Sequence, residues 1–337
     1  MSNPAWLSAP SLRLDAHGDA AFGGIEEEAA AALSGTTVTP LLQLGAIRAA
    51  GAEADTFLQN QLSNDLRQLV PAHVQLATYN SPKGRVLDLF ALRRDGDAIV
   101  LEARRDTLPA TLKRLRMFVL RAKVTLEEAA GYCALGLAGP QAAELLAGAG
   151  LPVPAQDWDC AAAGDLAVIR RPGTVERYTV HAGAERLRTL WPALAQQAVP
   201  VGTAAWRLLD ILAGLPSIRP ATADHFVAQM LNLDRLGAIS FSKGCYPGQE
   251  IVARMHYLGN LKRRMFRAHT AAAGVVPGSQ LYAAGGDGQA VGEVVDAAPC
   301  TEGTALLAVL QLGQSGAILR LGNPEGAMLE LMDGPES

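Results

Sequence analysis

The hydrophobic pattern changes after residue 262, and this change constrains the fold more than any other feature of the chain. Before residue 262, segments whose apolar residues alternate as in strands are interspersed with segments whose apolar residues are spaced as in helices. After it, only short strand-like segments remain, broken by glycine and proline. Such a run is typical of a small β-barrel or sandwich. Because a single core stops growing near ~250–300 residues, a chain of 337 residues is expected to form two or three domains.

The part before residue 262 reads as two mixed units. In the first, apolar residues recur at helical spacing over 51–66 and 108–119, residues 85–93 alternate as a strand, and Asp95-Gly96 is a hairpin signal. The second unit begins near residue 131 and repeats this mixture, with expected helices at 139–150 and 185–198 and paired strands at 166–170 and 175–181. Both units therefore indicate an α+β fold with mainly antiparallel sheets. A helix at 203–213 is expected to return the chain to the first unit.

These patterns predict four segments with defined boundaries. Residues 1–36 are rich in alanine, glycine and acidic residues and are expected to be weakly ordered, with a short helix at 25–33. The first α+β lobe is expected from residues 37–130 together with 201–261, the second from 131–200, and the C-terminal β-barrel from 262–337.

Composition and charge argue against several classes of function. The net charge is −4, and no basic patch is interleaved with aromatic residues, so we expect no direct binding to nucleic acid. No apolar stretch reaches the ~18 residues needed to span a membrane. The start of the chain lacks a secretory pattern, and the acidic run Glu26–Glu28 argues against a mitochondrial transit peptide. We therefore expect a cytoplasmic protein.

The four cysteines are far apart in the sequence and form no Cys-x-x-Cys pair; they are Cys133, Cys160, Cys245 and Cys300. This spacing predicts neither a zinc site nor a self-contained iron–sulfur cluster, so no metal site is expected. A disulfide framework is also not expected in a chain this long with so few cysteines.

One loop, residues 243–250, gathers reactive groups in the order Lys-Gly-Cys-Tyr-Pro-Gly-Gln-Glu. Cys245 lies two residues from Lys243, and a nearby ammonium lowers the pKa of a thiol toward the reactive thiolate. The side chains of Gln249 and Glu250 can pair with the planar donor edge of a pterin or guanine ring. An equally good interpretation is a Gly-Pro turn whose cysteine merely packs. The residues alone leave both interpretations open.

Residues 239–254 closely resemble the YgfZ-type folate-binding proteins, whose signature is a Lys-Gly-Cys-Tyr/Phe-x-Gly-Gln-Glu loop. These are relatives of the glycine-cleavage T-protein, an aminomethyltransferase. The resemblance includes residues 57–65, 81–85 and 206–216, and it covers roughly residues 40–330. It implies a three-lobed T-protein-like fold, with two α+β lobes and a small C-terminal β-barrel. It also implies that tetrahydrofolate, or another reduced folate, binds in the central opening.

The resemblance places Trp206 where the family has a tryptophan against the folate, and a flat indole suits this role. Packing of Trp206 on the core is the alternative. The second folate-contacting tryptophan of the family has no counterpart, since Leu44 lies nearest to its place. The amides of Gln229 and Asn232 can complement a pterin edge or cap loop backbone. Arg254 can hold the glutamyl tail, or belong to a solvated face.

Asp88 lies where the T-protein has an acidic pair near the folate nitrogen, at which a carboxylate aids proton transfer. Here Leu89 follows, so the pair is absent. The Gly-x-Asp-Gly-x-Glu segment of the T-protein is also missing, because residues 172–178 contain only the acid Glu176. These departures favour a YgfZ-type role and leave it uncertain whether the protein is an enzyme.

The resemblance thus implies a tetrahydrofolate-binding accessory protein in iron–sulfur cluster assembly or repair, supporting enzymes that include tRNA-modifying ones. Its partners would be a reduced folate and iron–sulfur client enzymes or assembly proteins. Cys245, helped by Lys243, would supply a thiol, although a single cysteine cannot hold a four-thiolate cluster. One alternative is an aminomethyltransferase-like one-carbon enzyme with Asp88 as acid and base. Another is a non-enzymatic folate-sensing scaffold.

Overall fold

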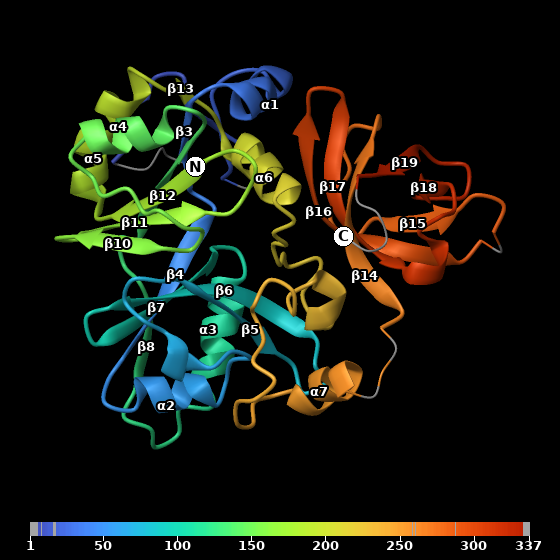
Figure 1. The fold of residues 1–337 in the computed structure, drawn as a ribbon, viewed down its shortest axis with the longest axis horizontal. Helices are drawn as coiled ribbons and strands as arrows, with labels where there is room; N and C mark the ends of the chain where they lie inside the picture. The colour runs from blue at the N-terminus through green and yellow to red at the C-terminus, as the bar shows by residue number, and fades with distance from the viewer. Residues whose placement is uncertain are drawn as a thin grey trace.

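A computed structural model of the chain describes residues 6–7, 9–15, 18–257, 259, 261–286 and 288–332. Figure 1 shows three lobes: two mixed α/β lobes, one above the other, and an all-β lobe beside them. The predicted α+β architecture with a C-terminal β-barrel is confirmed.

The first lobe is built on a five-stranded antiparallel sheet in the order β5-β6-β7-β4-β8. Its strands are β4 (Leu44–Ala50), β5 (Gln75–Asn80), β6 (Val86–Asp95), β7 (Ala98–Arg104) and β8 (Thr125–Glu128). The predicted hairpin is present, with Gly96 at φ +58° in the turn between β6 and β7. Helices α2 (Ala54–Gln59) and α3 (Leu108–Arg116) contribute to the core of this lobe. In α3 this core face is the predicted apolar stripe, since Leu108, Leu112 and Leu115 are buried.

The second lobe is a six-stranded sheet in the order β10-β11-β12-β9-β3-β13, antiparallel except for the pair β13 and β3. Its strands are β3 (Thr37–Pro40), β9 (Cys133–Ala138), β10 (Cys160–Ala163), β11 (Leu166–Arg171), β12 (Arg177–Ala182) and β13 (Val199–Pro200). Helices α4 (Ala142–Gly148) and α5 (Ala184–Ala195) pack on it. Residues 37–40 therefore belong to the second sheet, not to the first lobe as predicted.

Helix α6 (Thr203–Leu212) also lies elsewhere than predicted. It packs mainly against α1 (Ile25–Ser34), the second sheet and the barrel strand β16 (Ala290–Cys300), and reaches the first lobe only at its edge. The reason is that Gly136 on β9 has no side chain. A Cβ atom at this position would come within 2.4 Å of the Trp206 ring. Only glycine lets the helix approach the sheet this closely.

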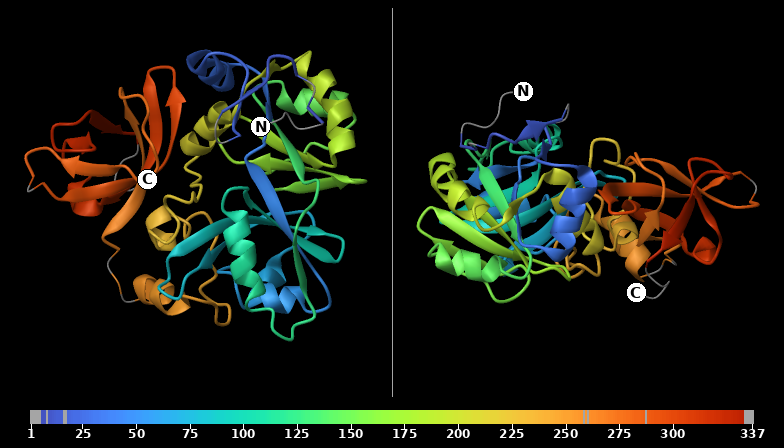
Figure 2. Two further views of the ribbon diagram at one scale, coloured as in Figure 1. Left: turned by 180° about the vertical axis from the view of Figure 1, so that it is seen from behind. Right: turned by 90° about the horizontal axis from the view of Figure 1, so that it is seen from above.

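The described part of residues 1–36 is packed, so the prediction of a weakly ordered segment is wrong for it. Trp6, Leu7 and Leu12 are buried in the core of the second lobe, and helix α1 (Ile25–Ser34) lies between the mixed lobes and the barrel (Figure 2). Acidic composition indicated solvent exposure, but the Glu28 carboxylate is buried and accepts hydrogen bonds from three backbone N–H groups, those of Phe22, Gly23 and Gly202. Residues 1–5, 8, 16 and 17 lie outside the described residues. Within that segment, β1 (Arg13–Leu14) pairs with β2 (Ala20–Ala21).

The last lobe is a closed barrel in the order β14-β17-β16-β15-β18-β19. Its strands are β14 (Arg263–Thr270), β15 (Gln280–Ala283), β16 (Ala290–Cys300), β17 (Gly303–Gln311), β18 (Leu319–Leu321) and β19 (Met328–Leu331). A separate core fills it, which explains why this region had its own sequence pattern. Residues 333–337 of the predicted barrel are not among those described. In the described parts of the chain, none of the helices has the length and apolar character to cross a bilayer.

Candidate functional site

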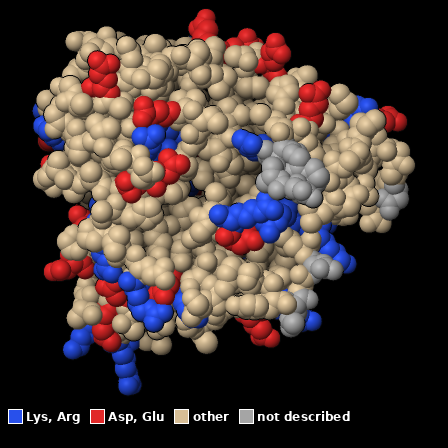
Figure 3. Space-filling model, in the orientation of Figure 1, with Lys and Arg blue, Asp and Glu red and all other residues tan. Residues whose placement is uncertain are grey.

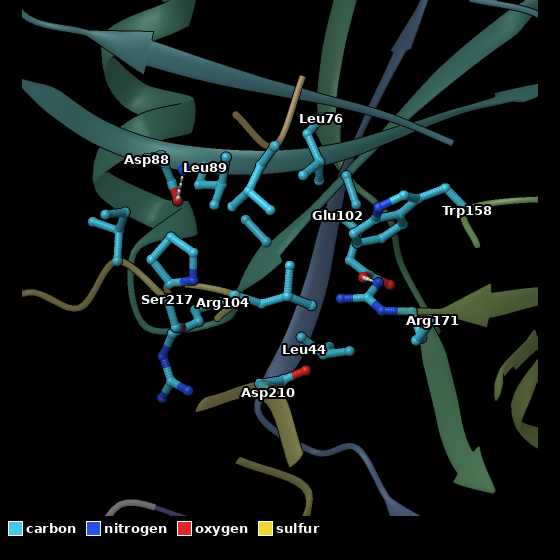
Figure 4. Close-up of a pocket in the computed structure, with 16 residues that line it drawn as sticks. Leu44, Leu76, Asp88, Leu89, Glu102, Arg104, Trp158, Arg171, Asp210 and Ser217 are labelled. Atoms are coloured by element: carbon cyan, nitrogen blue, oxygen red, sulfur yellow. Dashed lines mark hydrogen bonds and ion pairs between the residues drawn. The ribbon is translucent and has the colours of Figure 1, made fainter. Parts of the chain in front are cut away.

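A central cavity lies where the two mixed lobes face the segment that follows α6 (Figure 4). Its apolar lining includes Leu44, Leu76, Leu89, Ile218 and Leu236. Its polar lining comes from Asp88, Glu102, Arg104, Arg171 and Asp210. An apolar cavity with a few converging polar groups is the usual form of a small-molecule site.

Trp158 forms one wall of this cavity, in the loop between α4 and β10. Its backbone adopts the left-handed conformation, with φ +67°, which is rare for a bulky residue and is often found at functional sites. Backbone hydrogen bonds to Val74 and Arg170 hold the loop in place. The Arg171 guanidinium lies 4.5 Å from the centre of the indole. Sequence reasoning missed Trp158, because a loop residue follows no period.

Glu102 holds this wall together from β7. Its carboxylate pairs with Arg171 at 3.2 Å and accepts a hydrogen bond from the Tyr132 hydroxyl at 2.7 Å. Figure 4 shows the Glu102–Arg171 pair beside Trp158, with Asp88 across the cavity. Burial raises the pKa of Glu102, but the charges of Arg171 and Arg93 and the Tyr132 hydrogen bond outweigh burial and hold it below its usual value. The carboxylate is therefore ionised at neutral pH.

His181 completes this network as a neutral imidazole. Burial lowers its pKa to about 4. Because the single Tyr132 proton goes to Glu102, His181 Nδ1 donates to the Tyr132 oxygen at 2.9 Å, and Nε2 accepts from Thr179 at 2.8 Å. Glu102, Tyr132 and His181 thus form a connected hydrogen-bond network behind Trp158, while the buried Nε of Arg171 has no partner among the described residues.

Asp88 is the one predicted site residue that lines the central cavity. It lies on β6 and is 1% exposed. Its Oδ2 accepts a hydrogen bond from Thr111 Oγ1 at 2.8 Å, and its Oδ1 accepts one from the Leu89 N–H at 3.0 Å. Burial outweighs these bonds and raises the pKa of Asp88 to about 7. A carboxyl with this pKa can donate or accept a proton near neutral pH.

Cys245 is exposed and lines a second cavity of about 530 Å³, whose lining shares no residue with the central one. Gln249 and Glu250, in the first turn of α7 (Gln249–Tyr257), line the same cavity. The structure thus brings three predicted site residues together and keeps them apart from Asp88.

Lys243 does not take the place predicted for it beside the thiol. It is 5% exposed, and its ammonium donates to the backbone carbonyls of Gln59, Leu62 and Asn64 at 2.5, 2.6 and 2.9 Å. Burial lowers its pKa to about 8. All three ammonium protons are used, so Lys243 fixes the loop to the first lobe and has none left for the Cys245 sulfur.

Trp206 is also placed differently from the prediction. The indole is 2% exposed and lies between Gly136 and the guanidinium of Arg177, which is 5.2 Å from the ring centre. The alternative, packing on the core, is what the structure shows. The tryptophan with access to the central cavity is Trp158.

The predicted amides act as structural ties. Gln229 Nε2 donates to the Val252 carbonyl of α7 at 2.6 Å. Asn232, at φ +57°, ends a short 3-10 helix and donates to the Met265 carbonyl of β14 at 2.8 Å. Both therefore serve the commoner use, capping backbone. Arg254 is exposed on α7.

Metal ligands and surface charge are two further features that can mark a site. Within the described residues, no three His, Cys, Asp or Glu side chains are grouped so that they could hold a metal. On the face drawn in Figure 3, Lys and Arg side chains are interspersed with Asp and Glu, so no broad field of one sign covers that face.

The comparisons with known proteins fit this geometry. Residues 1–236 match the family model described as the GCVT N-terminal domain. The fold matches glycine cleavage system aminomethyltransferase T from Bartonella henselae with a TM-score of 0.81, over 97% of this chain and 94% of that one. At 18% identity this likeness shows the fold alone. The fold and cavity thus define a protein of the T-protein class.

Relatives with higher sequence identity show which family within this class the chain belongs to. The chain is 32% identical over 237 residues to the tRNA-modifying protein YgfZ of Colwellia psychrerythraea, which covers 70% of this chain and 72% of the relative. It is also 32% identical over 221 residues to that of Edwardsiella ictaluri, over 65% and 67% of the two chains. The chain belongs to the YgfZ family within the GcvT superfamily, as the resemblance predicted.

Proposed function

We propose that this protein binds a reduced folate in its central cavity and supports tRNA-modifying enzymes through the assembly or repair of their iron–sulfur clusters. The observation that carries the proposal is the cavity itself, with an indole wall on one side and a buried carboxyl on the other. Family membership adds to it, since the relatives are named tRNA-modifying proteins.

The central cavity holds about 90 Å³, so it would enclose only part of a folate, and its lining suits the pterin ring. A flat heteroaromatic ring stacks on an indole face, and Trp158 offers one that the Glu102–Arg171 pair holds in place. A buried carboxyl such as Asp88 suits the donor edge of a pterin. Arg104, at the cavity wall, suits a carboxylate tail. A bound reduced folate would supply a carrier for one-carbon groups; the chain supplies the stacking face, the proton-holding carboxyl and the apolar enclosure.

Calorimetric titration with tetrahydrofolate tests this proposal. Trp158→Ala is expected to weaken binding about 5- to 150-fold, because stacking of a flat base on an aromatic ring contributes about 1–3 kcal/mol. Tyr257→Ala, an exposed aromatic on α7, is the control and should leave the affinity unchanged. Absence of saturable binding by the intact protein, or unchanged binding by Trp158→Ala, would refute the assignment.

The exposed thiol of Cys245 supports the iron–sulfur part of the proposal. It faces outward, so it can meet a partner, and a cluster held there would need ligands from that partner. In a deletion strain, Cys245→Ala should fail to restore the activity of iron–sulfur tRNA-modifying enzymes, while binding tetrahydrofolate normally. Full restoration by this variant would remove the thiol from the function.

The raised pKa of Asp88 favours a second candidate, transfer of a one-carbon unit from an amine to tetrahydrofolate. A carboxyl with a pKa of about 7 is suited to hold and return a proton in that reaction. Formation of methylene-tetrahydrofolate from an aminomethyl donor, lost in Asp88→Asn, would support it. No turnover by the intact protein with any such donor would reject it.

A further inference from the structure

The cavity beside Cys245 contains polar groups that nothing in the fold satisfies. Asn80, at the end of β5, is 1% exposed, and neither its Nδ2 nor its Oδ1 has a hydrogen-bond partner among the described residues. Burying an amide without partners is costly and uncommon in native proteins. The pairing of β5 with β6 shifts register between Tyr79 and Asn80, the kind of bulge that re-aims a side chain. The unpaired amide lines the cavity with Cys245.

Arg114, which also lines this cavity, hydrogen-bonds the Tyr79 hydroxyl but keeps one free donor. Its Nε is buried without a partner. The residue lies on α3 and lines both the cavity beside Cys245 and an adjoining one of about 410 Å³. A buried guanidinium N–H requires an acceptor, and a carboxylate is the strongest one that a protein offers.

The two cavities form one groove along α3. Tyr79 and Arg114 line both, so they join at these residues. The α3 segment lines the groove with Thr107, Ala110, Thr111, Lys113, Arg114, Met117 and Phe118. The carboxylates of Asp106 and Glu250 also line it. We call this the α3 groove. Its apolar end, beside Cys245, carries Met117 and Phe118, which are 60% and 45% exposed.

From these features we infer that the α3 groove binds an extended apolar segment of a partner protein, with an acidic side chain at Arg114, and delivers it to Cys245. A peptide group has one donor and one acceptor, as the Asn80 amide does, so backbone satisfies both of its free atoms. An acidic side chain satisfies Arg114, and an apolar one covers Met117 and Phe118. A helix of nine residues is ~13 Å long, which corresponds to about four extended residues. This inference does not rest on folate binding.

Disulfide capture at Cys245 tests the chemistry of the segment. The probe is a library of acetylated tetrapeptides with three randomised positions before a cysteine, each capped as a mixed disulfide with cysteamine. Exchange forms the bond between Cys245 and the peptide sulfur and releases cysteamine. We expect acidic and apolar residues to be enriched at least tenfold over basic ones among peptides mapped to Cys245. Capture without preference would overturn the inference.

Two arginine variants locate the acidic preference. Arg114→Met should abolish it, whereas Arg121→Met, which removes an equal charge from an exposed residue outside the groove, should keep it. Equal behaviour of the two variants would assign the preference to the general surface charge and refute the groove. Tetrahydrofolate binding should be unchanged in both variants, which separates this outcome from a failure of the proposed function.

Replacing Asn80 by leucine distinguishes a ligand-binding amide from a structural one. If its amide awaits a ligand, Asn80→Leu should raise the melting temperature, because it removes unpaired polar atoms, and should reduce capture at least tenfold. The matched control is Asn64→Leu, since the Asn64 amide donates to the Leu76 and Gly237 carbonyls at 2.7 Å each and its loss should lower the melting temperature. A lower melting temperature for Asn80→Leu, with capture unchanged, would overturn the inference.

Discussion

The central cavity and the α3 groove differ in how their polar groups are partnered. Behind Trp158, Glu102 and His181 have their hydrogen-bond partners within the protein. In that wall the Nε of Arg171 lacks a partner among the described residues. In the groove, both polar side-chain atoms of Asn80 and the Nε of Arg114 lack one. A paired wall is preorganised for a small ligand, whereas unpaired groups gain their partners only on binding. The comparison shows two neighbouring sites whose polar groups are partnered differently.

The largest expected effect is the loss of stability when the hydrogen bonds behind Trp158 are removed. Glu102→Ala leaves Arg171 and Tyr132 without their buried partner, so it should lower the free energy of unfolding by about 3–5 kcal/mol in urea titrations. Glu127→Ala, an exposed carboxylate on β8, should change it by less than about 0.5 kcal/mol. Equal losses in the two variants would show that the wall is not a buried network.

The next largest effect is the change in the free energy of unfolding with pH that the titration of Asp88 causes. Its pKa is about 7 in the folded chain against an ordinary value of 3.8, so the folded state keeps a proton that the unfolded state loses. Stability should therefore fall as the pH rises from about 4 to 7, by up to about 4 kcal/mol, and then level off. Asp88→Asn should lack this fall. Parallel curves of unfolding free energy against pH for the two proteins would contradict the raised pKa.

A smaller loss of stability is expected from replacing Lys243, which fixes the loop 243–250 to the first lobe. Lys243→Met leaves three carbonyls without their donor and should lower the free energy of unfolding by about 2 kcal/mol. Lys262→Met, with an exposed side chain, is the control and should be nearly neutral. If Lys243→Met were as stable as the intact protein, the anchoring role of this lysine would be wrong.

The sequence predicted those features that depend on local signals. The hairpin at Asp95-Gly96 and the barrel after residue 262 follow from turn chemistry and short periods, and both are present. The position of α6 was not predictable, because it depends on Gly136, a residue 70 positions before Trp206 that leaves room for the indole. Sequence spacing does not show which surfaces meet.

The candidate site shows the same division. Asp88 was found through its motif, and it lines the central cavity. Trp206 and Lys243 were chosen from sequence position, but the direction of a side chain decides its role, and theirs point into the core and to backbone carbonyls. Trp158 escaped because its loop conformation, at φ +67°, leaves no periodic trace. Asn80 escaped because an unpaired amide is visible only once its surroundings are known.

Thr111 links the central cavity and the α3 groove thermodynamically. Its side chain lines the α3 groove, while its hydroxyl donates to Asp88 at the wall of the central cavity. That bond lowers the pKa of Asp88, so an occupant of the groove that took the hydroxyl proton for itself would raise it. Linkage between two sites is reciprocal. If a ligand of the central cavity binds more tightly to one protonation state of Asp88, an occupant of the groove would change the affinity for that ligand. The ligand would then change the affinity of the groove for its occupant by the same factor.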